Sequence, residues 1–169
     1  MTSRSPHRSQ GFTLLEILVV LVIIGIVVSM ATLSLGNNAA RQVELEAERL
    51  RALIELAKEE ALFNAQELGI VFWQNGYTFY RMDNQQWTPI SGDAELRPRT
   101  LSEGLSVALE LEGLNAELAP LPRERKRPQV FILSSGEVTP FTAEIGIGDT
   151  YVTLTADALG NLAFAAPPT

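Results

Sequence analysis

A single carboxylate, Glu16, lies at the start of the most apolar stretch of this 169-residue chain. No residue from Ile17 to Ala40 is charged, and the first half of that run is almost purely aliphatic. A carboxylate inside a bilayer costs about 3 kcal/mol on insertion scales, so intramembrane acids are usually paired and functional. An acid near the headgroups can instead snorkel to water. Glu16 is therefore either an interfacial acid or one that pairs with a specific cation.

Cleavage of the bond between Gly11 and Phe12 would supply such a cation. Phe12 would then carry a free α-amine, which is positively charged near neutral pH. This amine would lie one helical turn from Glu16, in a medium where opposite charges attract strongly. Within one chain the two charges only neutralise each other. Between chains, Glu16 of one subunit could bind the amine of the next and set the offset of neighbouring helices, which predicts a subunit that polymerises.

The residues around this bond resemble the class III signal of type IV pilins and type II secretion pseudopilins. They are a basic leader, Gly11, the segment Phe12–Glu16 (FTLLE) and the aliphatic helix that follows. The resemblance implies that a membrane-embedded prepilin peptidase cleaves between Gly11 and Phe12 and N-methylates Phe12. It also implies that Glu16 is the carboxylate used in assembly.

The segment 12–36 is long enough to cross a membrane, since roughly 20 apolar residues of helix span the hydrocarbon core. Arg4 and Arg8 precede it, and positive charge before the first apolar segment keeps that end in the cytoplasm. We therefore expect a single-pass protein of the inner membrane with its C-terminal domain in the periplasm.

An ordinary secretory signal peptide, cut after Ala31, is the alternative interpretation of the N-terminus. Glu16 would then lie inside the apolar core of the signal, and the Gly11–Phe12 signature would have no role. Both observations favour a leader of residues 1–11 and a retained helix.

The composition excludes most catalytic chemistries. The chain has no cysteine, and its one histidine, His7, lies in the leader. The mature chain would therefore contain no Ser-His-Asp triad, thiol nucleophile or histidine or thiolate metal site. We predict that the protein is not an enzyme and has no catalytic residue, metal or cofactor.

The charge of the mature chain disfavours nucleic acid as a partner. The leader carries two arginines and no acid, so its removal lowers the formal net charge from −7 to −9. Non-specific nucleic-acid binding depends on neutralising phosphates, which an acidic chain does poorly. The basic cluster 123–127 (RERKR) could contact anionic lipid, an acidic subunit or DNA locally, or form a solvated loop.

The apolar spacing predicts that the helix continues through the segment 37–66, from Phe12 to about Ala65. Two helices separated by a loop at Gly36–Asn38 are the alternative. The continuation is amphipathic, because apolar residues recur at intervals of three and four along one face. These residues are Val43, Ala47, Leu50, Ile54, Ala57 and Ala61.

The segment 67–169 changes to a period of two, which predicts a β-rich periplasmic domain. The first hairpin pairs 70–73 with 77–80, and Asn75-Gly76 supplies the positive φ angles of its turn. Further strands are expected at 87–90 (an edge), 106–111, 130–133 paired with 138–141 in a second hairpin, 151–155 and 162–165. The fold class is therefore α+β, a long helix packed on antiparallel sheet.

Three stretches resemble the H-type (GspH-like) minor pseudopilins of type II secretion. They are 96–99 (LRPR), 131–141 (FILSSGEVTPF) and 157–162 (DALGNL). The resemblance implies a pilin-like fold with a two-sheet head, and a structural subunit near the tip of the pseudopilus during export of folded proteins across the outer membrane. It would join a tip of I-, J- and K-type subunits to the major G-type shaft, on the inner-membrane assembly platform. A FimT-like minor type IV pilin, for pilus assembly or DNA uptake, is the alternative.

Overall fold

The chain divides into two units, Met1–Asn38 and Ala39–Thr169, and helix α1 (Leu14–Asn64) contributes to both. The structure, a computed structural model, describes residues 14–120 and 127–165, apart from the side chains of residues 28–37. The bounds of α1 agree with the single helix predicted from Phe12 to about Ala65. The backbone at Gly36–Asn38 is helical, where the alternative interpretation placed a loop.

The first unit contains the apolar half of α1. Every described side chain from Leu14 to Val27 is solvent-exposed. In the described part of the chain, no helix combines the length and hydropathy of a membrane span.

The second unit contains the amphipathic half of α1, whose buried face is the one predicted from its spacing. All six residues of the predicted stripe, from Val43 to Ala61, are fully buried. Their intervals of three and four place them on one face of the helix, and burial of this face against the sheets stabilises the helix more than its intrinsic propensity does.

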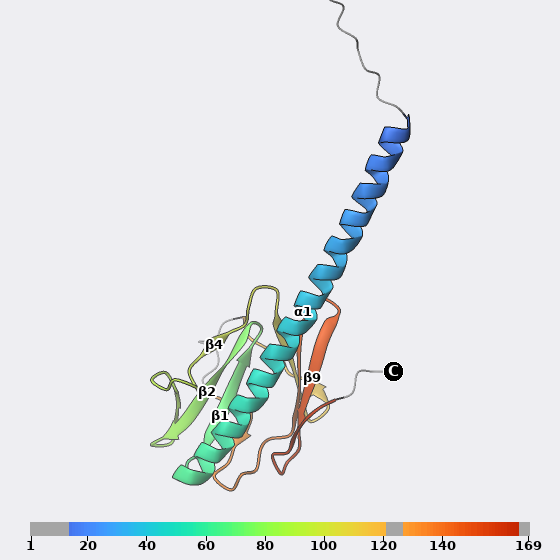
Figure 1. The fold of residues 1–169 in the computed structure, drawn as a ribbon. Coiled ribbons are helices and arrows are strands. Elements are labelled where there is room, and N and C mark those ends of the chain that lie inside the picture. Colours follow the sequence, from blue (N-terminus) through green and yellow to red (C-terminus); the bar gives the residue numbers. More distant parts are fainter. Residues whose placement is uncertain (1–13, 121–126, 166–169) are drawn as a thin grey trace, which may run out of the picture. The chain divides into compact units, whose positions relative to one another are not determined.

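Two five-stranded antiparallel sheets form the remainder of the described second unit, as the predicted α+β class requires. In Figure 1, this part of α1 lies between the labelled strands β1 and β9. The first sheet has the order β3-β2-β1-β7, with β4 paired to β2, and the second has the order β10-β9-β8-β5-β6. The strands are β1 (Leu68–Trp73), β2 (Gly76–Asp83), β3 (Gln86–Pro89), β4 (Arg99–Thr100), β5 (Ser106–Leu111), β6 (Leu114–Asn115), β7 (Val130–Ile132), β8 (Phe141–Ile147), β9 (Thr150–Ala156) and β10 (Leu162–Phe164).

The first predicted hairpin is confirmed, but its predicted turn is wrong. Trp73 pairs with Gly76, so the connecting residues are Gln74 and Asn75 and not Asn75-Gly76. Positive φ angles occur instead in the next connection, at Asn84 (46°) and Gln85 (65°). Two-residue hairpin turns of type I′ need positive φ at both central residues, and asparagine tolerates it well.

Neighbouring segments determine the conformation of the β1–β2 turn. The Gln74 N–H donates to the Ala119 carbonyl at 3.1 Å, and the Leu101 N–H donates to the Asn75 carbonyl at 2.9 Å. These hydrogen bonds satisfy the backbone groups of the turn through segments that are distant in the sequence. A pattern of local turn residues therefore does not predict the conformation of this turn.

Gly76 is required for close packing rather than for the turn. A Cβ at this position would lie 2.3 Å from the Arg99 carbonyl oxygen and 2.4 Å from the Trp73 ring. We expect Gly76→Ala to lower the free energy of unfolding by about 1–3 kcal/mol, because β4 must move away from β2. Gly92→Ala is the matched control, since a Cβ there meets nothing within 4 Å. Equal urea midpoints for the two variants would contradict this packing.

The second predicted hairpin is confirmed around its turn but not as far as Phe141. Ile132 bridges Val138, the Leu133 N–H donates to the Glu137 carbonyl at 2.8 Å, and the Thr139 N–H donates to the Phe131 carbonyl at 2.9 Å. Phe141 instead starts β8 and pairs with Leu111 and Ala156 of the other sheet. Pro140 has no N–H to donate, so the ladder cannot continue past it and the chain passes from one sheet to the other. The residues 142–147 of β8 were not predicted as a strand.

Candidate assembly surfaces

Of the three predicted site residues, the structure describes Glu16. Gly11 and Phe12 lie outside the described residues. Glu16 is the acidic residue of the first turn of α1, where a negative charge interacts favourably with the helix dipole. Its helical neighbours are the exposed aliphatic side chains of the first unit.

The exposed apolar side chains of this segment form an interaction surface. Leu14 is 91% exposed and Leu15 is 73% exposed, and the run continues without a polar residue from Ile17 to Val27. Soluble monomers rarely expose contiguous apolar surface of this extent, which marks a protein or membrane contact.

A buried carboxylate joins α1 to the first sheet in the second unit. Glu46 is only 5% exposed, and its Oε1 accepts a hydrogen bond from the Tyr77 hydroxyl at 2.8 Å. Its Oε2 accepts one from the Arg49 guanidinium at 2.6 Å. Glu46 was not predicted as a buried residue, although it follows Val43 by three and precedes Leu50 by four, the spacing of the buried stripe.

Tyr77 is held in its neutral, donating form. Burial raises the pKa of the Tyr77 hydroxyl, and the adjacent Glu46 carboxylate raises it further. The hydroxyl therefore donates to Glu46 over the whole physiological pH range, and the bond fixes the position of α1 on β2.

Tyr77→Phe removes this donor and leaves a buried carboxylate with one partner fewer. We expect a loss of about 1–3 kcal/mol in the free energy of unfolding, measured by urea denaturation of the detergent-solubilised chain. Tyr151→Phe is the control, because the Tyr151 side chain is partly exposed and its loss of a hydroxyl should have little effect. A Tyr77→Phe variant as stable as this control would show that the bond contributes nothing.

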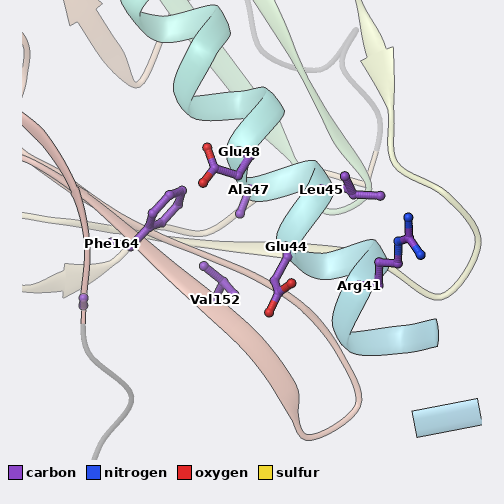
Figure 2. A pocket seen from close by; sticks show the side chains of 8 residues that line it. Arg41, Glu44, Leu45, Ala47, Glu48, Val152 and Phe164 are labelled. Atoms are coloured by element: carbon purple, nitrogen blue, oxygen red, sulfur yellow. The ribbon is translucent and has the colours of Figure 1, made fainter. Parts of the chain in front are cut away.

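A groove of about 480 Å³ lies between α1 and strands β9 and β10. Figure 2 shows Glu44 projecting from α1 toward Val152, and Glu48 beside Phe164. The Arg51 guanidinium lies 5.3 Å from the centre of the Phe164 ring, a cation–π contact. The groove is lined by Arg41, Glu44, Leu45, Ala47, Glu48, Val152, Phe164 and Ala165.

The groove was not predicted from the sequence, because its walls come from residues more than 100 positions apart. Among the described residues, no group of three or more histidine, cysteine or acidic side chains is placed to hold a metal ion. The chemistry that the groove offers is that of a binding surface, lined by apolar and by charged side chains.

Two family models match this chain. The prokaryotic N-terminal methylation motif matches residues 6–32, and type II transport protein GspH matches residues 46–160. The first match covers the predicted cleavage site and Glu16. The second covers most of the second unit.

Curated relatives are similar over most of their length. Type II secretion system protein H of Pseudomonas aeruginosa is 35% identical, over 80% of this chain and 81% of its own. The protein H of Aeromonas hydrophila is 31% identical, over 92% of this chain and 93% of its own.

Solved structures share the fold. The minor pseudopilin EpsH from the type 2 secretion system of Vibrio cholerae is 30% identical, with a TM-score of 0.65, over 76% of this chain and 98% of that one. The solution structure of Escherichia coli GspH is 25% identical, with a TM-score of 0.60, over 75% of this chain and 89% of that one. The predicted pilin-like α+β fold is thus confirmed.

Proposed function

Because the chain belongs to the GspH family and is a minor pseudopilin of the type II secretion system, we propose that it lies near the tip of the pseudopilus. There it joins the I-, J- and K-type tip subunits to the G-type shaft during export of folded proteins across the outer membrane. The observation that carries this proposal is the combination of an N-terminal methylation motif with the GspH-type two-sheet head in one chain.

We propose that prepilin peptidase cleaves between Gly11 and Phe12 and N-methylates Phe12. The segment 12–36 then anchors the subunit in the inner membrane, with its N-terminus in the cytoplasm and its head in the periplasm. The methylation motif over residues 6–32 supports this proposal, as does the exposed aliphatic surface from Leu14 to Val27.

Assembly moves the apolar half of α1 from lipid into a bundle of similar helices. The hydrophobic driving force for this transfer is small, because lipid tails are as apolar as leucine. A charge pair between Glu16 and the Phe12 amine of a neighbour stabilises the assembled state specifically. The assembly platform and its cytoplasmic motor supply the remaining work.

The head contributes partner recognition and no catalysis in this proposal. The mature chain holds neither histidine nor cysteine, and its family consists of structural pseudopilin subunits. The FimT-like alternative has less support, since the relatives from Pseudomonas aeruginosa and Aeromonas hydrophila are both type II secretion system proteins.

Deletion of the gene in the native host tests the proposal. We expect the exported proteins to accumulate in the periplasm, and a plasmid copy of the full chain to restore them to the medium. A plasmid copy that ends at Asn38, and so lacks the head, is expected to fail. Normal secretion by the deletion strain, together with loss of piliation or of DNA uptake, would overturn the proposal in favour of the type IV pilin alternative.

A further inference from the structure

In the part of the chain that the structure describes, strand β9 has an unpaired edge beside the groove. β10 pairs with β9 from Leu154 to Ala156, and the Ala165 N–H donates to the Thr153 carbonyl at 2.9 Å. In an antiparallel ladder, alternate residues direct their N–H and C=O to the same side. The backbone groups of Tyr151 therefore point to the same side as those of Thr153, and in the described part of the chain no strand pairs with β9 there.

The sequence beyond β10 is poorly suited to close this edge. In the β10 register, Ala163 lies opposite Thr155, so residue 167 would come opposite Tyr151. Residue 167 is a proline, which has no N–H to donate to the Tyr151 carbonyl. An open edge is a template for a strand from another chain.

The groove continues past this edge. A second cavity, of about 570 Å³, shares Glu44, Val152 and Ala165 with the first and extends it along β9 to Tyr151. We use the name β9 trough for the two together. Its lining residues comprise those of the first groove with Asp149, Thr150, Tyr151 and Thr153.

The charged lining of the β9 trough is mainly acidic. Glu44, Glu48 and Asp149 contribute three carboxylates, and Arg41 contributes one guanidinium. Arg51, beside Phe164, forms an ion pair with Glu48 at 3.8 Å, so acidic groups still exceed basic groups by one. The guanidinium extends away from Phe164 in the view of Figure 2, whereas Glu44 projects toward Val152. A lysine or arginine side chain from a partner would therefore be attracted into the trough.

We propose that β9 binds an extended segment of a neighbouring pseudopilin, which pairs with the backbone of Tyr151 and places a basic side chain in the β9 trough. Main-chain hydrogen bonds at a sheet edge give affinity, and a pocket for an alternate side chain gives specificity. This inference rests on the proposed function only in naming the partner as a pseudopilin. The side chain of Tyr151 is 45% exposed, so the edge is accessible.

Cross-linking from a single cysteine tests the contact directly. The chain has no cysteine, so Tyr151→Cys introduces a unique thiol for a photoactivatable maleimide on the full chain in membranes. The matched control is Leu114→Cys on β6, the opposite edge of the same sheet, where Leu114 is 73% exposed. We expect at least fivefold more cross-linked product from position 151, with the label on an extended, lysine- or arginine-containing segment of another pseudopilin.

Three cross-linking results would overturn the inference. They are labelling no higher than at position 114, labelling of a partner helix, and labelling of this chain's own residues after Ala165. Restored secretion in the same cells reports separately on the proposed function. If secretion is restored but position 151 gives no specific cross-link, the inference is wrong and the proposed function stands. If neither cysteine variant nor the unmodified chain restores secretion, the proposed function is wrong.

Two further substitutions separate backbone pairing from charge. Tyr151→Pro removes the outward N–H but no hydrogen bond to β8, and Tyr151→Val keeps that N–H. We expect the proline variant to retain the partner roughly fivefold to tenfold less well than the valine variant in pull-downs from detergent. If the proline variant fails to fold, the same pull-down with Glu44→Lys tests the charge. We expect Glu44→Lys to lose the partner. Glu59→Lys is the control and should retain it, because Glu59 is exposed on the same helix outside the trough. Equal retention by both lysine variants would overturn the inference.

Discussion

Glu16→Ala should abolish incorporation of the chain into the pseudopilus and leave removal of residues 1–11 intact. In the proposed assembly, the exposed aliphatic surface of α1 would gain little on passing from lipid to a helix bundle, so the charge pair would decide which state is favoured. Two opposite charges 4 Å apart attract by about 4 kcal/mol at an effective dielectric constant of 20. Loss of that energy corresponds to roughly a thousandfold change in the assembly equilibrium.

Two measurements check the Glu16 prediction. The mass of the membrane-bound chain reports cleavage, and the amount of chain in sheared pseudopili reports incorporation. Glu16→Gln should fail as Glu16→Ala does, since it keeps the size and loses the charge. Leu18→Ala, on the same exposed helix, should be incorporated. Wild-type secretion by the Glu16→Ala variant would refute the role of this carboxylate.

Phe72→Ala should destabilise the head by about 3–5 kcal/mol, a large part of the 5–15 kcal/mol that usually stabilises a domain. Phe72 is fully buried in β1. Its ring centre lies 6.2 Å from that of Tyr77 in its own sheet and 6.3 Å from that of Phe141 in the other sheet. Its removal therefore leaves a cavity where the two sheets meet.

Tryptophan fluorescence of the head in urea measures this loss, because Trp73 and Trp87 both belong to the first sheet. Phe131→Ala is the control, since Phe131 is 37% exposed and its ring is in contact with Trp87 at the surface. We expect a much smaller shift of the urea midpoint for the control. Similar midpoints for the two variants would show that the sheets do not meet at Phe72.

The elements predicted correctly are those determined by local periodicity. The buried stripe of α1 follows from spacings of three and four, and its residues from Val43 to Ala61 are all buried. The first hairpin follows from two strand-like segments that are neighbours in the sequence. Each of these signals is contained within one element or two consecutive ones, so the sequence was sufficient.

The features missed depend on contacts between distant segments. The turn at Gln74-Asn75 is held by Leu101 and Ala119, so the Asn75-Gly76 dipeptide did not determine it. Strand β8 was missed because Pro140 separates it from the bridge at Val138 and directs it into the other sheet. The β9 trough lies where β9 continues past Ala165, the last described residue bonded to it, which no local pattern indicates.

The buried Glu46 is an instructive intermediate case. Its position relative to Val43 and Leu50 was readable from the sequence, but a glutamate on an apolar stripe is usually solvent-exposed. Only the structure shows the Tyr77 hydroxyl and the Arg49 guanidinium that make its burial tolerable. Buried charges need such partners because desolvation is costly.

The N-terminus of the mature chain tests the central claim most directly. Intact-mass analysis of the protein purified from its native host gives both the first residue and any methyl group. The account predicts a membrane-bound chain that begins at Phe12 and carries one additional methyl group. A chain that begins at Thr32 and is recovered in the soluble periplasmic fraction would contradict it.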